Sequence, residues 1–492
     1  MGSFDRRSFL LGAAATTGGV FVGGSAQAVV ASAASAHPPD RFFVLGPVAD
    51  ARDGRVRLHL PPGFRYRSFH DTDGPPIVLD DGTVLPGRHD GMATFDGPNG
   101  DVWLVRNHEV NGSALGGTTT SLVSPSGEVH DAFTSLNGTQ MNCSGGAMPW
   151  GAWLTCEETV NGPDVFDDFT RNIPTPSPPT TYVQNARLQQ PHGFVFEVPA
   201  GEQSDRAPIT HAGRFAHEAA AYSPAEGYVY LTEDNFGFPS GLYRYLPPAN
   251  PIHAGHLEDG GDLQMLKVVG VEQAHLEAQQ SIGASYRVEW VTIDEPFPGT
   301  DGRFPTTGAG TPTVTNDEAI HFVGDQGRAQ GAAHFSRLEG ATFTRDEIWF
   351  TSTQGGGAAE TGPQPDLGYG RGTGQVWSYD PRRGRLTCRY QAPAATALDL
   401  PDNITARSDR GTIVICEDGP APNYVRGLTR HGDLFDIALN QLTRNAPPNA
   451  PRFGEEFAGA TFSPDGHTLF VNIQASQGIS FAIWGPWGRL GV

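Results

Sequence analysis

The chain has 492 residues, and its 33 Lys and Arg against 54 Asp and Glu give a formal net charge of −21 at pH 7. This acidity argues against nucleic acid or an acidic membrane surface as a partner, although it leaves an anionic substrate open, because bound metal ions reverse the local field. Glycine (63) and proline (40) are abundant, as many tight turns require, and the length exceeds that of one sandwich. We therefore expect one large all-β domain.

The first residues read as a targeting signal. Arg6-Arg7 precede an apolar run from Phe9 to Val22, and Ala26-Gln27-Ala28 offers a cleavage site, with Ala34-Ser35-Ala36 as a second choice. The apolar run is too short for a membrane anchor, and no span of about 20 apolar residues follows in the body. The twin-arginine route carries folded proteins, which suits a chain that takes up its cofactor in the cytoplasm. The export machinery is thus an expected partner.

This signal divides the chain. We predict a twin-arginine signal peptide over residues 1–28, a linker over 29–41 and a single catalytic domain over 42–492. The mature protein is expected in the periplasm, at the cell surface or outside the cell, without a stable membrane span and as a monomer.

Six stretches of the remaining chain repeat one pattern. Each is an apolar strand with polar tips, and a polar leader precedes it by about ten to fifteen residues. The strands are residues 102–109, 152–157, 229–234, 348–352, 413–418 and 469–472. The leaders are His89-Asp90-Gly91, Asn142-Cys143-Ser144-Gly145, His217-Glu218, Glu339-Gly340, Asp402-Asn403 and Glu456-Phe457. Turn formers lie between several leaders and their strands, as hairpins require.

A period of roughly 50 to 120 residues with its own hairpins in each unit is typical of propeller blades rather than of a sandwich. We predict a six-bladed β-propeller with loop insertions at one face. Long helical patterns are scarce, and Val271–Gln280 is the best helical candidate.

The innermost strands of a propeller line a central channel, so equivalent leader positions converge there. The residues brought together would be Asp90, Cys143, Glu218, Glu339, Asp402 and Glu456. Buried carboxylates and a thiol at close range require cations to neutralise them. The alternative is that each acid caps a turn or faces solvent, but a solvated turn does not need an acid at the same offset in each repeat. The pattern favours a metal site in the channel.

The four cysteines leave two interpretations open. In an exported chain, Cys156, Cys388 and Cys416 could be buried thiols or form a disulfide. Cys143 differs, because it stands where other repeats carry carboxylates and small residues follow it. It is a candidate metal ligand, with structural packing as the alternative.

Lys267 is the only lysine, so a side-chain cation at the site should be an arginine. Arg337 lies two residues before Glu339, and residues i and i+2 of a strand share a face. Its planar guanidinium suits bidentate phosphate recognition.

Several short blocks of polar and small residues occur in order along the chain. They are Asn107-His108-Glu109, Asn142 to Gly146, Pro149-Trp150-Gly151, Thr155 to Glu158, His217-Glu218-Ala219, Arg337 to Gly340, Pro401-Asp402-Asn403, Cys416 to Gly419 and Glu456 to Gly459. In these blocks the chain resembles the PhoX family of alkaline phosphatases, and the resemblance runs from about Phe42 to Val492.

The resemblance implies a six-bladed propeller that holds two irons and several calcium ions, with a cysteine thiolate bridging the irons. By position, Cys143 matches the bridging cysteine, Glu218 and Glu339 match iron-side carboxylates, and Arg337 and Asn107 match phosphate-contacting groups. The remaining acids are implied as calcium ligands or the residues behind them, namely Glu109, Asp402, Glu417, Asp418 and Glu456.

The implied function is hydrolysis of phosphate esters, with monoesters as the first expected substrates and diesters also considered. Two alternatives remain at this stage. A calcium-dependent propeller lactonase or organophosphate hydrolase would also use an acidic channel, but would not need Cys143, and a non-catalytic binding propeller would keep the acids only for structural calcium.

Overall fold

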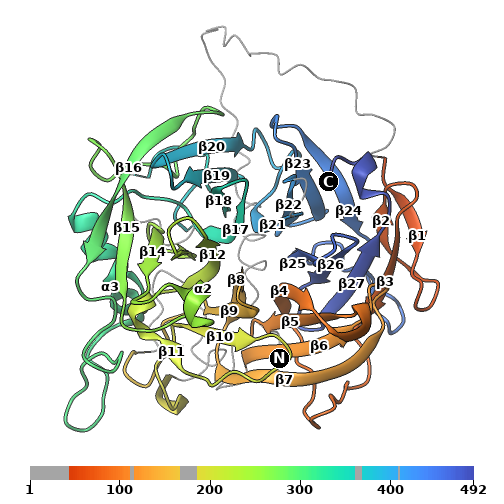
Figure 1. Ribbon diagram of the computed structural model, residues 1–492, viewed down its shortest axis with the longest axis horizontal. Helices are drawn as coiled ribbons and strands as arrows, with labels where there is room; N and C mark the ends of the chain where they lie inside the picture. The colour runs from red at the N-terminus through yellow and green to blue at the C-terminus, as the bar shows by residue number, and fades with distance from the viewer. Residues whose placement is uncertain (1–43, 111–115, 167–184, 361–367, 408–410) are drawn as a thin grey trace, which may run out of the picture.

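The computed structural model describes residues 44–110, 116–166, 185–360, 368–407 and 411–492. The predicted signal peptide (1–28) and linker (29–41) lie outside the described residues. Within the described ranges the fold is all-β and propeller-like, with sheets arranged around a common centre (Figure 1). No described helix is long and apolar enough to span a membrane.

The strands form antiparallel sheets that follow one another around the centre. The first two sheets contain β4 (His89–Asp96), β5 (Val102–His108), β6 (Gly116–Val123) and β7 (Val129–Thr139), then β8 (Asn142–Met148), β9 (Ala152–Glu157), β10 (Val195–Pro199) and β11 (Pro208–Ile209).

A nine-stranded sheet follows. It contains β12 (His217–Ser223), β13 (Tyr228–Glu233), β14 (Leu242–Leu246), β15 (Asp262–Val268), β16 (Ser285–Ile293), β17 (Leu338–Thr344), β18 (Glu347–Ser352), β19 (Gln375–Asp380) and β20 (Arg385–Gln391).

The last two sheets combine strands from both ends of the described chain. One contains β21 (Pro401–Ala406), β22 (Ile413–Glu417), β23 (Tyr424–Leu428), β24 (Leu434–Asn440), β2 (Val56–Leu60) and β1 (Gly46–Ala49), and the other contains β25 (Phe457–Phe462), β26 (Thr468–Ile473), β27 (Ile479–Trp484) and β3 (Arg65–Phe69). Because β3 completes a sheet of C-terminal strands, the two ends of the chain close the ring.

Six strands face the centre, one for each predicted repeat. In order around the ring they are β4, β8, β12, β17, β21 and β25, and each packs against the next. The repeat predicts six separate sheets, whereas the described strands form five. The difference arises where Ser285–Arg287 of β16 pair with Arg385–Thr387 of β20 and join two sets of strands into one sheet.

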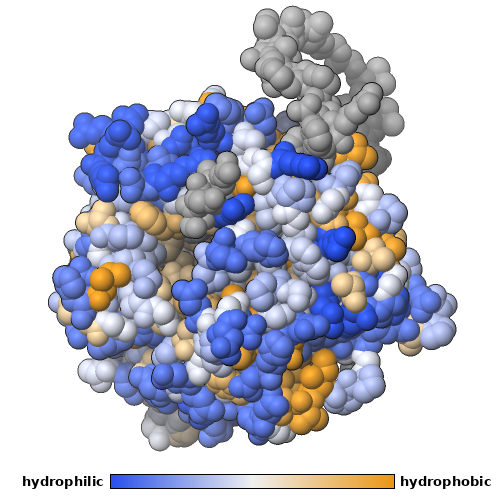
Figure 2. Space-filling model, turned by 45° about the vertical axis from the view of Figure 1, so that its right-hand side comes forward, coloured by the Kyte–Doolittle hydropathy of each residue, from blue (hydrophilic) through white to orange (hydrophobic). Residues whose placement is uncertain are grey.

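The apolar core is divided among the spaces between neighbouring sheets. Val414 of β22, Phe457 of β25 and Phe481 of β27, for example, belong to one buried cluster. Burial of these faces supplies the main driving force that holds adjacent sheets together. The face in Figure 2 is largely hydrophilic, with separate hydrophobic areas.

The helical prediction for residues 271–280 was wrong. This segment is a run of turns whose backbone pairs with the chain before β17, as in the bond from Gln273 N to Gly331 O (3.0 Å). The main described helix is α3 (Asn316–Ala329), which begins with a capping box between Thr315 and Glu318, and α2 (Pro251–Ala254) is a single turn.

Candidate metal centre

A β-bulge recurs near the start of the inner strands. In β4, β8, β12, β17 and β21 the pairing register skips two residues at the same place, as between His89 and Met92 of β4. The residues inside these bulges include the predicted leaders Asp90, Cys143, Glu218, Glu339 and Asp402. A bulge bends the strand and redirects its side chains, so one backbone feature, repeated around the ring, brings these five residues together.

The leader side chains form one group in which all members are buried except Asp402, which is partly exposed. Ligand atoms lie within 4.8 Å of one another in each of three sets, Asp90–Glu109–Cys143, Cys143–Glu158–Glu218 and Glu218–Glu339–Asp402. Because Cys143 and Glu218 are each shared by two sets, the sets are continuous. We call these seven residues the acidic cluster.

The sixth leader departs from the pattern. Glu456 precedes β25, whose bulge lies between Ala458 and Thr461. The sequence Gly-Ala-Thr-Phe begins at both Gly340 and Gly459, and this alignment places Glu456 at the position of Arg337 rather than of Glu339. Glu456 nevertheless lines the same cavity as members of the acidic cluster, together with Arg88 and Gln474.

A second set of acids stands at equivalent positions at the ends of the neighbouring strands. The pairs His89↔His108, Asn142↔Glu157, His217↔Glu233 and Pro401↔Glu417 are equivalent in register. In each pair the second residue belongs to the strand next to the inner strand. The residues that come directly after it in the sequence are therefore equivalent as well, and they are Glu109, Glu158, Asp234 and Asp418.

Glu158 was not among the residues predicted from the sequence. Its carboxylate lies 2.7 Å from the Cys143 sulfur. The preceding acid, Glu157, is engaged by the protein instead, since it accepts bonds from Gln140 N (3.0 Å) and Gly193 N (2.8 Å) and pairs with His192. The equivalent position in the first repeat, Glu109, was predicted, so alignment by strand register would have found Glu158.

Glu417 resembles Glu157 in its surroundings. It accepts hydrogen bonds from Asp399 N (3.1 Å), Tyr424 N (3.0 Å) and Arg426 Nε (2.9 Å), and burial raises its pKa to about 7. The structure thus directs this predicted metal ligand toward β23 rather than toward the acidic cluster. The next residue, Asp418, is buried. Burial of the Asp399 carboxyl and the negative charge of Asp418 together raise the pKa of Asp399 to about 6.

Arg337 lies immediately before β17 with a left-handed backbone conformation, φ 45°. Its Nε and Nη2 groups donate to the two oxygens of Asp234 (3.0 and 2.9 Å), and Nη2 also donates to Glu339 (2.9 Å). Arg88, two residues before Asp90, has a similar φ of 46° and donates to Glu109 (3.0 Å). Two arginines therefore border the acidic cluster, and Asp234, which sequence reasoning missed, fixes the orientation of Arg337.

Asn107 is buried and fully hydrogen-bonded by the protein. Its amide nitrogen donates to the carbonyls of Cys143 (3.0 Å) and Ser144 (2.7 Å), and its oxygen accepts from Trp153 and Thr155 (both 2.8 Å). These bonds make Asn107 a residue that positions the Cys143 bulge, and the phosphate contact that the resemblance implied stays a prediction.

The same kind of bond recurs around the ring. Thr232 donates to the carbonyl of Glu339, Thr351 to that of Asp402 and Asn472 to that of Asp90, each at 2.6 Å. Each bond runs from the second strand of one repeat to the bulge of the next. With the bond from Asn107 to the carbonyl of Cys143, four of the five bulges are thus held by side chains of the preceding repeat, and the bulge of Glu218 is not among these four.

The donor set of the cluster fits metal ions. Its carboxylates outnumber the two bordering guanidiniums, and burial of unbalanced like charge is costly unless cations compensate it. Carboxylate oxygens are the ligands that calcium prefers, and thiolate suits iron. All four cysteines are described and free, so the possible disulfide is not formed, and burial raises the pKa of the Cys388 thiol to about 12. Cys143 alone among them lies in the cluster.

Comparison with known proteins gives a family. The model of the family described as alkaline phosphatase PhoX matches residues 114–477. Among solved structures, the fold is similar to Pseudomonas fluorescens PhoX in complex with vanadate, a transition state analogue, with a TM-score of 0.60 and 17% identity over 91% of this chain and 98% of that chain. A gluconolactonase from Xanthomonas campestris matches less well, with a TM-score of 0.39 and 12% identity over 90% of this chain and 99% of that one. No curated protein matches the chain.

Proposed function

The chain belongs to the PhoX alkaline phosphatase family of phosphoric ester hydrolases, and from this premise we propose that it is an exported phosphatase whose acidic cluster holds iron and calcium. The observation that carries the proposal is Cys143 inside a buried ring of carboxylates, with Arg337 beside it. Phosphate monoesters are the proposed first substrates, with diesters as a second class.

We assign the metal ligands by donor chemistry. Cys143, Glu218 and Glu339 would hold two irons bridged by the thiolate. Glu109, Asp402, Asp418 and Glu456 would bind calcium. Asp90 and Glu158, which the structure places in the same cluster, would be further calcium ligands. When bound, these ions polarise phosphoryl oxygens and stabilise the charge that develops during displacement. Glu417 supports the neighbouring strand in this scheme.

The protein's own groups orient the ester. Arg337, held by Asp234 and Glu339, presents a fixed positive charge at the edge of the cluster. A guanidinium that is oriented before substrate arrives stabilises developing phosphoryl charge without reorganisation. Asn107 acts indirectly. Its side-chain amide donates to the carbonyls of Cys143 and Ser144, and these bonds hold the backbone that carries the thiol.

The closed ring of inner strands supports a six-bladed propeller, in which the nine-stranded sheet contains two blades joined through β16 and β20. Residues 42–492 would form this single domain as a monomer. We further propose that residues 1–28 direct export by the twin-arginine route and 29–41 form a linker. Arg6→Lys with Arg7→Lys should retain precursor inside the cell, and normal secretion of this variant would show another route.

The deciding experiment measures turnover and metal content on one purified sample. We expect hydrolysis of p-nitrophenyl phosphate, roughly two irons per chain plus calcium, and a visible thiolate-to-iron charge-transfer band. Turnover of lactones or phosphotriesters with calcium alone would favour the lactonase or organophosphate hydrolase alternative. Bound calcium without turnover of any of these substrates would favour a binding propeller.

A further inference from the structure

The inner strands share a second backbone feature, directly before the strand begins. In four of the five repeats with the leader bulge, the residue two positions before the leader has a left-handed backbone, with φ between 45° and 48°. These residues are Arg88, Met141, Arg337 and Leu400. Residues with a Cβ seldom adopt this conformation, which persists only where the surrounding structure enforces it. We call this place the pre-leader position.

Side chains at the pre-leader position reach the cavity of the acidic cluster. The alignment of the last repeat places Glu456 there, and both Arg88 and Glu456 line this cavity. Of the four residues with the left-handed backbone, only Arg88 and Arg337 are charged, because the other two are apolar. The two arginines are therefore equivalent by backbone position and not merely neighbours of the same acids.

The two arginines belong to opposite sides of the ring. Arg88 comes directly before β4 and Arg337 directly before β17, which are the first and fourth of the six inner strands in their order around the centre (Figure 1). Arg88 Nη1 donates to Glu109 (3.0 Å), and Arg337 Nη2 donates to Glu339 (2.9 Å). These two acids belong to the first and the last of the three linked sets of the cluster. The guanidiniums thus meet the cluster at opposite ends.

The backbone of Arg88 is fixed from two sides. Its N–H donates to the carbonyl of Ala475 (2.7 Å), and its carbonyl accepts from the N–H of Glu109 (3.0 Å). The preceding Gly87 approaches the carbonyl of Ser476 so closely that a Cβ would not fit. The last repeat and the segment after β5 therefore hold the base of the Arg88 side chain in place before a substrate arrives.

Arg88 differs from Arg337 in its access to solvent. Its side chain is 21% exposed, against 2% for that of Arg337. Gln474 links Arg88 to the cluster, since its oxygen accepts from Arg88 Nη1 (3.5 Å) and its nitrogen donates to Asp90 (2.6 Å). Arg88 thus stands at the accessible edge of the cluster, whereas Arg337 is embedded in its wall.

From these positions we propose that Arg88 is a second phosphate-contacting residue, which meets the phosphoryl group of a monoester opposite Arg337. A guanidinium has five N–H donors in one plane, so one side chain can hold a carboxylate and a phosphoryl oxygen together. The proposal rests on the proposed phosphatase function and deepens it, because it assigns the residue that favours monoesters. A monoester has about two negative charges and three terminal oxygens, whereas a diester has less charge and one such oxygen fewer.

The test compares the two ester classes in the metal-loaded protein. Arg88→Gln keeps a donor for Glu109 but removes the charge. It should lower kcat/KM for p-nitrophenyl phosphate by about 30-fold or more, and that for bis(p-nitrophenyl) phosphate by less than about fivefold. Arg88→Lys keeps the charge without the planar fork, and should recover part of the monoester activity.

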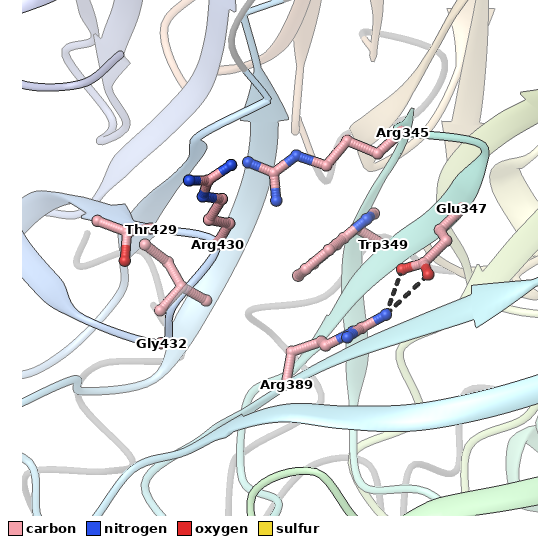
Figure 3. Close-up of a pocket in the computed structure, with 8 residues that line it drawn as sticks. Arg345, Glu347, Trp349, Arg389, Thr429, Arg430 and Gly432 are labelled. Atoms are coloured by element: carbon pink, nitrogen blue, oxygen red, sulfur yellow. Dashed lines mark hydrogen bonds and ion pairs between the residues drawn. The ribbon is translucent and has the colours of Figure 1, made fainter. Parts of the chain in front are cut away.

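Arg345→Gln is the matched control. Arg345 also has a left-handed backbone (φ 55°), but it lies at the turn of the β17–β18 hairpin, beside Trp349 and Arg430 (Figure 3). This variant removes the same charge at a strained position outside the cavity of the cluster. It should leave kcat/KM for both esters within about twofold of the parent.

A second readout does not use turnover. Equilibrium dialysis against labelled inorganic phosphate should show affinity at least about tenfold weaker in Arg88→Gln than in the parent or in Arg345→Gln, at equal iron and calcium content. Parental phosphate affinity in Arg88→Gln, or equal losses on both esters together with loss of calcium, would overturn the proposal. A parent that binds phosphate but hydrolyses neither ester would contradict the proposed function alone, and the phosphate affinity of Arg88→Gln would still decide the role of Arg88.

Discussion

The acidic cluster lies at one end of the β17–β18 hairpin, and a group of arginines, Arg345, Arg389 and Arg430, lies near its turn (Figure 3). Glu339 stands at the bulge near the start of β17, and Arg345 forms the turn that ends it. Six residues of extended strand separate the two by about 20 Å. One end of the hairpin therefore carries mainly carboxylates and the other mainly guanidiniums, and the length of the strand keeps the two groups apart.

The two groups differ in how the chain builds them. The acidic cluster arises from one position in each inner strand, repeated around a closed ring. The arginine group arises where side chains from two neighbouring sheets meet. The same backbone bulge in five inner strands positions the acidic cluster, so its geometry does not depend on any single contact. A group built from turns depends on the positions of a few side chains.

The largest expected effect concerns the acidic cluster. Glu339→Gln and Cys143→Ala should each lose iron and the charge-transfer band, and lower turnover more than a thousandfold, because both remove a proposed metal ligand from the cluster. Elemental analysis and visible absorbance measure this loss.

Glu417→Gln is the matched control, since it changes a buried acid of the same type on β22. We expect it to keep iron and colour while the free energy of unfolding falls by about 1 to 3 kcal/mol, the cost of a weakened bond to a buried charged partner. Loss of iron in Glu417→Gln would show that this residue is a ligand after all.

Arg337 should have the next largest effect. Loss of its charge from the transition state should cost about 3 to 5 kcal/mol, or roughly 100- to several-thousandfold in kcat/KM. Because Arg337→Ala also leaves buried Asp234 without its partner, the sharper variant is Arg337→Ala with Asp234→Asn.

The double variant should keep its metals and colour while phosphatase activity falls. Arg337→Lys keeps the charge without the planar fork, and should recover part of the lost activity. Near-parental kcat/KM in the double variant on every ester tested would make the role of Arg337 structural.

Much of the fold and of the cluster could be predicted because both follow the repeat. Leaders such as Asp90 and Glu218 recur with their strands, and a ring of strands forces them together. Glu158 was missed because a pair of adjacent acids ends several second strands, and only the register shows that the first acid of each pair lies opposite the start of the inner strand. The metal-ligand role of Glu417 stays a prediction, while its carboxylate accepts bonds from Asp399, Tyr424 and Arg426.

Contacts between sheets could not be predicted. Asp234 meets Arg337 across 103 positions in the chain, and the pairing of β16 with β20 depends on how two sets of strands lie against each other. The group of Arg345 and Arg430 is of the same kind, since these side chains meet only when two turns are brought together.

The smallest effect concerns the bonds that hold the bulges. Asn107→Ala and Asn472→Ala remove equivalent donors, to the carbonyls of Cys143 and Asp90 respectively. Each leaves a buried carbonyl short of a partner, so each should lower the free energy of unfolding in urea by about 1 to 3 kcal/mol. Asn107→Thr, which copies the residue found at Thr232 and Thr351, should recover part of that loss.

Comparison of the two variants separates positioning from phosphate contact. If Asn107 only positions its bulge, Asn107→Ala and Asn472→Ala should lower kcat/KM to a similar degree, and the loss should follow their metal content. If Asn107 instead contacts the substrate, Asn107→Ala should raise KM for p-nitrophenyl phosphate at full metal occupancy while Asn472→Ala does not. That result would restore the phosphate-contacting role and would mean that the amide exchanges its bonds to the Cys143–Ser144 carbonyls when substrate binds.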